Sequence, residues 1–437
     1  MGMLERAMGL GLRAINRFAG LPLVDRLKLR KPAEQLLYHG SRTGFRAASS
    51  AARAFKAATS LGRPARLKTG EVRGLFDLTP TDEQQMLREA AQSFALEQLR
   101  PAALAADTAS AAPEDLLAQA AELGFTQLGI PEELGGAGSE RSTVANVLVA
   151  EALAQGDMGL AVACLAPAAV STALVLWGDA QQQAHYLPAF VGATPPAAAL
   201  AILEPRPLFD PLNLQTTARR DGTDYVLDGV KALVPRAAQA ELFIIAAQTE
   251  AGPALFIVES GAAALTVEAD PGMGLRAAAT GRLHLKNLRV PASALIAQGS
   301  APVYAECLAL SRLGWCALAV GTAQAALDYL IPYVNDRVAF GEPISHRQSV
   351  AFAVSNVAIE LDGMRLTTWR AASRAEQGLD FVRETAIARR LCADKGAIIG
   401  ADAVQLLGGH GFTKEYPVER WYRDLRAAGL MEGAILV

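Results

Sequence analysis

The chain has 437 residues, of which 51% are hydrophobic and 19% are charged. A chain this long and apolar can bury a large core over two or three domains, which excludes a disordered tail or a fibre. Aromatic residues make up 6%, while alanine and leucine dominate. This balance predicts a mainly helical protein, because alanine and leucine lose little side-chain entropy in a helix.

The net charge of −3 hides an asymmetry along the chain. Residues 1–74 hold 15 Lys and Arg against 4 Asp and Glu, so the chain begins with a basic extension, which we place at 1–75. Apolar residues at helical spacing predict a short amphipathic helix there, followed by a second over about 32–55. The residues that form this apolar spacing are Leu4, Met8, Gly11, Ile15 and Phe18.

Two interpretations of the extension stay open. Residues 1–60 either contact an anionic membrane surface or pack on the rest of the protein or a neighbouring subunit. The extension lacks the long apolar run of a transmembrane span and the pattern of a secretory signal. We therefore expect a cytoplasmic location, with peripheral attachment at the inner face of a membrane as the second interpretation.

Cysteine and histidine give no sign of a disulfide framework or a metal site. The four cysteines are scattered without paired spacing and sit in apolar surroundings, which predicts free, buried thiols. The five histidines contain no pair at ligand spacing, so we expect no catalytic metal. We also expect no nucleic-acid partner.

Residues 76–196 read as a helical domain. The segment Thr79-Pro80-Thr81-Asp82-Glu83-Gln84 resembles a helix start, with acids in the first turn, and predicts a helix over 83–98. Further helices are predicted over 113–123, 142–154 and 160–176. Between the second and third of these four helices, Pro131 to Gly136 carries the Pro and paired glycines of a turn.

Residues 197–302 read as a compact β domain, and residues 303–437 as a helical bundle. Short β-type runs separated by Gly, Asp and Pro lie at 225–227, 242–246, 254–258 and 282–288. After Pro302 come long helical patterns over 312–335, 348–376 and 381–407, each long enough for one rod of a bundle.

Two motifs make this layout specific. The first is Arg337-Val338-Ala339-Phe340-Gly341 with Gln348 downstream; the second runs from Gln405 through Gly408-Gly409-His410-Gly411-Phe412 to Glu432. Together they resemble the acyl-CoA dehydrogenases, and the resemblance extends from about residue 76 to the end of the chain. It implies an N-terminal helical domain, a middle β-barrel domain and a C-terminal helical bundle.

The resemblance implies that FAD is the cofactor. In the family, the residues matching Arg337, Phe340 and Gln348 and those matching Gln405, Gly408 and Gly409 hold the pyrophosphate and adenosine from a neighbouring subunit. A guanidinium fork suits paired phosphate oxygens, and glycines let backbone N–H groups approach phosphate. Taken alone, each segment also fits an ordinary helix C-cap.

Glu432 takes the place of the family's catalytic base, which removes a proton α to the thioester while a hydride leaves the β carbon. Such a base needs desolvation to raise its basicity, and the neighbours Leu430, Met431 and Ile435 are apolar. The other interpretation is a glutamate stabilised at a helix start. Arg312 matches an arginine that in relatives lies near the acyl-CoA and the base, so we expect it to contact the substrate.

The β domain departs from the family where the flavin ring normally lies. Leu203 and Phe209 replace a Thr and a Ser, Leu233 replaces a Trp that packs on the ring, and Pro235 replaces a Thr that bonds it. Pro235 also lacks an N–H donor. Ala434 replaces a further Thr near the cofactor.

The resemblance implies α,β-dehydrogenation of an acyl-CoA thioester, in a homodimer or homotetramer that passes electrons to an electron-transferring flavoprotein or a similar acceptor. The divergent ring positions favour an alternative: a degenerate subunit that binds acyl-CoA, or pairs with an active dehydrogenase, without turnover. A third interpretation is an oxidase that passes electrons to oxygen.

Overall fold

A computed structural model describes residues 78–136, 142–192 and 194–435. The chain divides after Leu75 into two units, and the description below concerns the second. The amphipathic helices and the membrane contact predicted for the basic extension lie outside the described residues. The predicted boundaries at residues 76, 197 and 303 stay predictions.

The first layer is helical, and its elements begin where the sequence supplies caps. Thr81 caps the first helix, accepting a hydrogen bond from the Gln84 amide while Gln84 accepts one from Thr81. Pro80 therefore precedes the cap residue. The helix continues past the predicted end through one π-helical turn and stops where Ser110 adopts a left-handed conformation. The elements are α4 (Asp82–Phe94), η1 (Ala95–Leu99), α5 (Arg100–Ala109), α6 (Glu114–Glu122), η2 (Glu132–Leu134), α7 (Thr143–Ala154), α8 (Met158–Trp177) and α9 (Ala180–Phe190).

The middle layer is a seven-stranded sheet, and the predicted β-barrel is wrong. The strand order is β1-β4-β2-β3-β7-β6, with β5 paired to β4, and among the described strands β6 forms no pairing that would close the path. The sheet stays open, and helices cover its apolar face, because residues of α8, α9 and the first bundle helix pack with the sheet in one apolar cluster. The strands are β1 (Ala198–Ala201), β2 (Thr217–Asp221), β3 (Asp224–Val234), β4 (Leu242–Thr249), β5 (Gly252–Glu259), β6 (Leu265–Ala269) and β7 (Gly281–Pro291).

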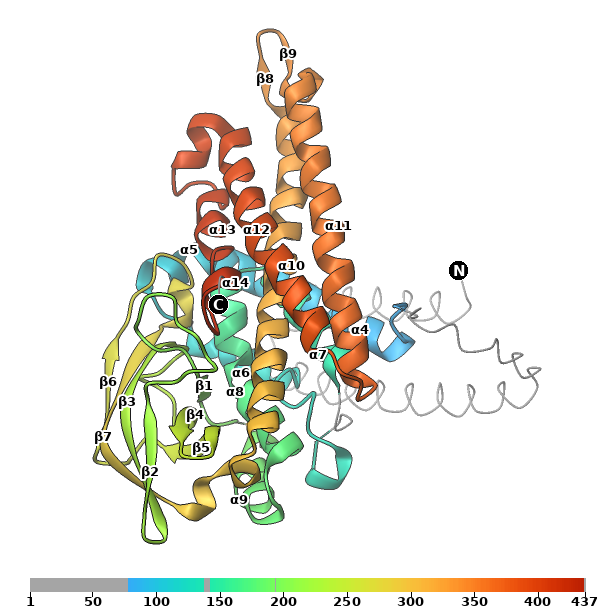
Figure 1. The fold of residues 1–437 in the computed structure, drawn as a ribbon. Coiled ribbons are helices and arrows are strands. Elements are labelled where there is room, and N and C mark those ends of the chain that lie inside the picture. The colour runs from blue at the N-terminus through green and yellow to red at the C-terminus, as the bar shows by residue number, and fades with distance from the viewer. Residues whose placement is uncertain (1–77, 137–141, 193, 436–437) are drawn as a thin grey trace, which may run out of the picture. The chain divides into compact units, whose positions relative to one another are not determined.

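The third layer is the predicted bundle of long helices, which the structure confirms. In Figure 1, α10, α11 and α12 run side by side, and α14 lies against α10 and α12. A two-stranded hairpin, β8–β9, joins α10 to α11. The elements are α10 (Ala301–Asp336), β8 (Val338–Ala339), β9 (Glu342–Pro343), α11 (Gln348–Glu376), α12 (Val382–Leu407), α13 (Val418–Asp424) and α14 (Ala427–Leu430). Short 3-10 turns complete the described chain: η3 (Arg276–Ala278), η4 (Ala292–Ala294), η5 (Ile296–Gly299), η6 (Ile344–His346) and η7 (Gly408–Phe412).

Two helices, α8 and α10, are long and apolar enough to cross a membrane by length and composition. Most residues in the apolar stretch of each helix are buried inside the protein. Their composition is therefore accounted for by packing, since both helices contribute to the same core cluster.

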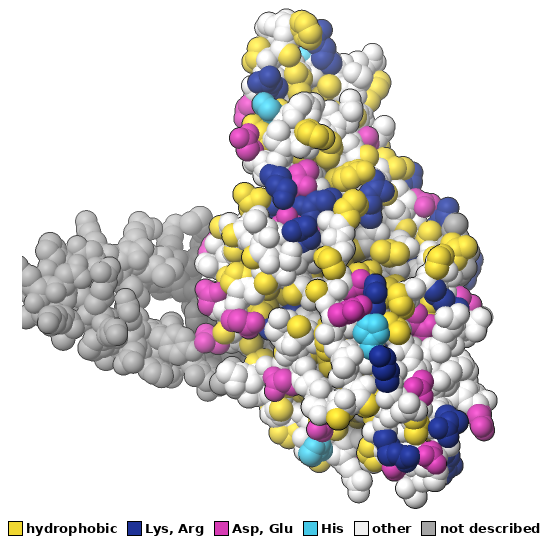
Figure 2. All heavy atoms as spheres, turned by 90° about the vertical axis from the view of Figure 1, so that its left-hand side faces the viewer, with side chains coloured by type: hydrophobic (Ala, Val, Ile, Leu, Met, Phe, Trp, Pro, Cys, Tyr) yellow, Lys and Arg dark blue, Asp and Glu magenta, His cyan; other side chains and the backbone are white. Residues whose placement is uncertain are grey.

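The face turned to the viewer in Figure 2 carries basic and acidic side chains intermixed with apolar ones. On β6 and β7, Arg282 pairs with Glu268 at 3.3 Å and with Asp270 at 2.8 Å. Glu268 is exposed, and exposed pairs contribute about 0–1 kcal/mol each, whereas Asp270 is half-buried.

A buried ion pair anchors the segment that leads to the chain end. Nε of Arg420 in α13 lies 2.8 Å from Oδ2 of Asp157, and Oδ1 of Asp157 accepts a hydrogen bond from the Leu160 amide, capping α8. Nearby, Asp424 accepts a hydrogen bond from the Leu275 amide. Burial raises the pKa of Asp424 to about 8, with the charge of Asp157 adding to the effect. Helix α13 is thereby tied to the first helical layer and to the loop before β7.

Candidate active site

Glu432 is a buried carboxylate, 5% exposed, in the turn after α14. Its Oε1 accepts a hydrogen bond of 2.9 Å from the Ser311 hydroxyl on α10, while Oε2 has no partner within the described residues. Burial raises the pKa of Glu432, and hydrogen bonds from Ser311 and the Trp315 side chain oppose this rise. One oxygen is therefore oriented by α10 and the other is free to take a proton.

The backbone around Glu432 is held by two arginines from different helices. The Arg312 guanidinium donates from Nε at 3.1 Å and from Nη2 at 2.9 Å to the Glu432 carbonyl. Arg389 of α12 donates to the carbonyls of Met431, at 3.0 Å, and Gly433. Glu432 itself has a φ of 58°, which is uncommon for a non-glycine residue and persists only where the surroundings enforce it. Arg312 and Arg389 supply that constraint.

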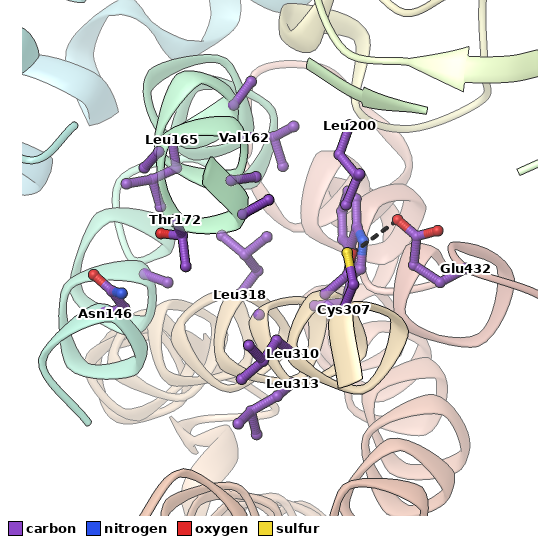
Figure 3. A pocket seen from close by; sticks show the side chains of 18 of the residues that line it. Asn146, Val162, Leu165, Thr172, Leu200, Cys307, Leu310, Leu313, Leu318 and Glu432 are labelled. Carbon is purple, nitrogen blue, oxygen red and sulfur yellow. Dashed lines mark hydrogen bonds between the residues drawn. The ribbon is translucent and has the colours of Figure 1, made fainter. Parts of the chain in front are cut away.

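Glu432 lines a cavity of about 230 Å³ to which all three layers contribute residues. Figure 3 shows Glu432 at one end, Asn146 and Thr172 at the other, and apolar side chains between them. The walls come from α7 and α8, from the start of α10, and from the ends of β1 and β3. A long, mostly apolar space that begins at a buried carboxylate suits an acyl chain bound next to a base.

The wall contributed by the sheet depends on a buried pair, Glu204 and Lys231. The Lys231 ammonium lies 3.0 Å from Glu204 Oε1 and donates to the Ile202 carbonyl at 3.0 Å. Glu204 also accepts hydrogen bonds of 2.8 Å from the amides of Gln215 and Thr216. Burial lowers the pKa of Lys231 to about 8, an effect that Glu204 opposes. The pair fixes β3 against the end of β1, next to the cavity.

The residues that depart from the family where the flavin ring normally lies are at or next to this wall. Leu203, Leu233 and Pro235 line the cavity, while Phe209 is buried in the adjacent apolar cluster and its carbonyl accepts the Ala434 amide at 3.0 Å. The Leu233 amide already donates to Asp270. Leu203, Leu233 and Pro235 therefore offer a planar ring only apolar contact at this wall. This wall fits a planar ring that is held by apolar packing.

The predicted cofactor contacts are at the far end of the bundle. Arg337 follows α10 directly, at roughly 37 Å along the helix axis from Arg312 for a rise of about 1.5 Å per residue. Arg337, Gln348, Gln405 and the Gly408-Gly409 turn are all exposed, as is Phe340 at 95%.

A Cβ added to Gly408 or Gly409 meets nothing within 4 Å, and Gly408 has a φ of 58°. An exposed guanidinium beside open glycine backbone fits phosphate chemistry. These groups are too far from Glu432 to act on a ring in the cavity of the same chain.

Arg312, predicted to contact the substrate, binds the Glu432 carbonyl and is not among the residues that line the cavity. Several further residues of the site were not predicted from the sequence. Ser311 was adjacent to a residue already singled out, whereas Arg389 is one of several charged residues in α12 and nothing in the local sequence distinguished it. Asn146 and Thr172 gave no local signal, since isolated polar residues in helices are common.

Comparison with known proteins agrees with this architecture. Models of the acyl-CoA dehydrogenase N-terminal, middle and C-terminal domains match residues 81–193, 199–288 and 301–436. The mitochondrial short-chain specific acyl-CoA dehydrogenase of Rattus norvegicus is 30% identical, over 86% of this chain and 94% of the relative.

Solved structures show the same fold. Butyryl-CoA dehydrogenase from Megasphaera elsdenii superimposes with a TM-score of 0.76 at 27% identity, covering 83% of this chain and 97% of that protein. An FAD complex of PigA superimposes with a TM-score of 0.76 at 26% identity, covering 82% and 96%.

A helical layer, an open sheet and a helical bundle around a buried carboxylate define a flavoprotein oxidoreductase fold. The chain belongs to the acyl-CoA dehydrogenase family. The predicted class, a flavin-dependent oxidoreductase acting on CH–CH bonds, is confirmed.

Proposed function

We propose that this protein is an FAD-dependent acyl-CoA dehydrogenase in which Glu432 removes the α proton of the bound thioester. The observation that carries the proposal is the Glu432 carboxylate, which is buried in the cavity wall with Oε2 unpartnered among the described residues. A buried acceptor oxygen without a donor is costly to a fold and is therefore expected to have a function.

The surroundings of Glu432 favour proton abstraction. An α proton is weakly acidic, so the base gains from desolvation, which raises its pKa. Ser311 keeps the carboxylate oriented, and Arg312 and Arg389 hold its backbone. When bound, FAD supplies the acceptor for the hydride that leaves the β carbon.

The cofactor is proposed to be shared between subunits. Arg337, Gln348, Gln405 and the Gly408-Gly409 turn would hold its phosphates and adenosine, with Phe340 exposed beside them. Since these groups lie far from the cavity of their own chain, they would serve the cavity of a neighbour. This arrangement supports a homodimer or homotetramer, with an electron-transferring flavoprotein or similar acceptor as electron partner.

An absorption spectrum tests the proposal. The purified protein, incubated with FAD and separated from free cofactor, is expected to show flavin bands that bleach under anaerobic conditions when an acyl-CoA is added. A protein that stays colourless after incubation with FAD contradicts the proposal.

The second candidate is a subunit that binds acyl-CoA without turnover. The apolar ring wall at Leu203, Leu233 and Pro235 favours it. It predicts saturable acyl-CoA binding by calorimetry with no flavin bands and no bleaching, so the same preparation separates the two candidates.

Ser311→Ala is expected to shift the acidic limb of the pH profile of kcat/KM to higher pH. Ser311 donates to the charged form of Glu432, so its loss favours the protonated form and raises the pKa of the base. At pH values below this limb, kcat/KM of the variant should be about tenfold lower than that of the wild type, which is the effect of losing one hydrogen bond to a charged group. Ser355→Ala on α11, far from Glu432 in sequence and exposed, is the matched control. An unchanged acidic limb in Ser311→Ala would show that this hydrogen bond does not tune the base.

A further inference from the structure

The end of the cavity opposite Glu432 is polar. Asn146 projects from α7 and Thr172 from α8, and Figure 3 shows both at the end remote from Glu432. Both side chains are half-buried, and neither makes a hydrogen bond to any described residue. A Cβ built on Gly129 would lie 3.1 Å from Thr172 Oγ1 and 4.0 Å from Asn146 Nδ2. The two polar groups thus converge on a space that glycine leaves open.

The middle of the cavity is different in chemistry. Its walls are apolar side chains from α8 and α10, including Val162, Leu165, Leu313 and Leu318. A saturated chain leaving the thioester at Glu432 would therefore make apolar contacts first and reach Asn146 and Thr172 last. A methyl terminus there would desolvate both polar groups without pairing them, which lowers the affinity for such a chain.

A terminal hydroxyl removes that cost, because it can donate to one of the two groups and accept from the other. A terminal carboxylate fits less well. Among the described lining residues Glu432 is the only charged side chain, so a buried carboxylate at the far end would have no cationic partner.

We propose that the site selects acyl thioesters whose chain carries a hydroxyl at its distal end, held by Asn146 and Thr172. The inference rests on the proposed function, because it takes the cavity as the acyl-binding site. It deepens that function by assigning specificity to two residues remote from the reacting carbons.

The test compares matched pairs of thioesters of equal length, one with a terminal hydroxyl and one without, across a series of lengths. Binding is measured by calorimetry using thioesters with sulfur in place of carbon 3, which cannot lose a hydride from that position. Oxidation of the corresponding natural thioesters gives kcat/KM. At the best length, the hydroxylated thioester is expected to bind about tenfold tighter than its partner, from roughly one net hydrogen bond.

Thr172→Val and Asn146→Leu are each expected to reduce this preference several-fold while leaving the affinity for the unsubstituted thioester equal or higher. Thr172→Ser, which keeps the hydroxyl, should retain the preference. Thr367→Val, on α11, is the control for a Thr-to-Val change elsewhere. Thermal melting of each variant establishes that it is folded.

Three outcomes overturn the inference. Equal affinity for both members of every pair, unchanged by the substitutions, refutes the inference but leaves the proposed function intact. Tighter binding of a thioester with a terminal carboxylate also refutes it, and assigns the polar end to an anion. Failure of the wild-type protein to bind any thioester in the series refutes the proposed function itself.

Discussion

Glu432→Gln is expected to lower kcat by about 10³-fold or more, because a glutamine amide cannot accept the α proton and general bases contribute about 10²–10⁴-fold. The substitution preserves shape and the hydrogen bond from Ser311, so affinity for an acyl-CoA should change little. Turnover with saturating thioester and calorimetric binding are the two measurements. Glu415→Gln, at an exposed site in the same C-terminal motif, is the matched control.

The same variant is expected to be more stable than the wild type at neutral pH. Burial raises the pKa of Glu432 above its ordinary value of 4.5, so the folded state holds this proton more tightly than the unfolded state. Stability is therefore lost as pH rises from 4.5 through the higher folded pKa, and the neutral glutamine escapes the loss. The melting temperature of Glu432→Gln should exceed that of the wild type at pH 7, and the two should converge in acid. A lower melting temperature at pH 7 would show that the carboxylate stabilises the fold.

Arg420→Met is expected to lower the free energy of unfolding by about 3–5 kcal/mol, because it leaves the buried Asp157 carboxylate without its counter-ion. Chemical denaturation at neutral pH provides the measurement. Arg390→Met is the control, since Arg390 pairs with Asp394 on the surface at 2.7 Å and such pairs contribute about 0–1 kcal/mol.

Two further results would show whether the loss of stability in Arg420→Met comes from the unpaired Asp157 carboxylate. In Arg420→Met the pKa of Asp157, already raised by burial, should rise further, so the difference from wild type should shrink as pH falls and the carboxylate protonates. Adding Asp157→Asn to Arg420→Met should recover part of the lost stability. If Arg420→Met costs no more than Arg390→Met, the ion pair does not anchor α13.

Much of the helical fold could be predicted from sequence because apolar spacing and caps are local signals. The predicted bundle helix over 348–376 coincides with α11, and 381–407 nearly coincides with α12. Helix α9 was missed, since its Gln-rich start and internal Pro188 resemble a loop. Strand β2 was missed because its sequence, Thr217–Asp221, is polar and mostly exposed. Its pairing with β3 defines it as a strand, and no apolar alternation in the sequence predicts it.

The barrel prediction was wrong for a related reason. Each strand signal is local, whereas closure depends on which strands exchange hydrogen bonds. The edge strand β6 pairs only with β7 among the described strands, and helices cover the apolar face instead.

The site was predictable only where a motif carried it. Glu432 followed from its place in the C-terminal pattern, but its φ of 58° and the hold of Arg389 on the neighbouring carbonyls depend on contacts between distant segments. Such contacts cannot be predicted from the spacing of residues in the sequence. The polar end formed by Asn146 and Thr172 is likewise visible only once α7 and α8 are packed together.

The most direct test of Glu432 as base isolates the proton step. In D2O, a thioester with sulfur in place of carbon 3 can exchange its α hydrogens but cannot transfer a hydride from that position, so exchange followed by NMR reports proton abstraction alone. The FAD-loaded wild-type protein is predicted to catalyse this exchange, and Glu432→Gln to leave it at the uncatalysed rate. Equal exchange by the wild type and Glu432→Gln would contradict the assignment of Glu432 as the base.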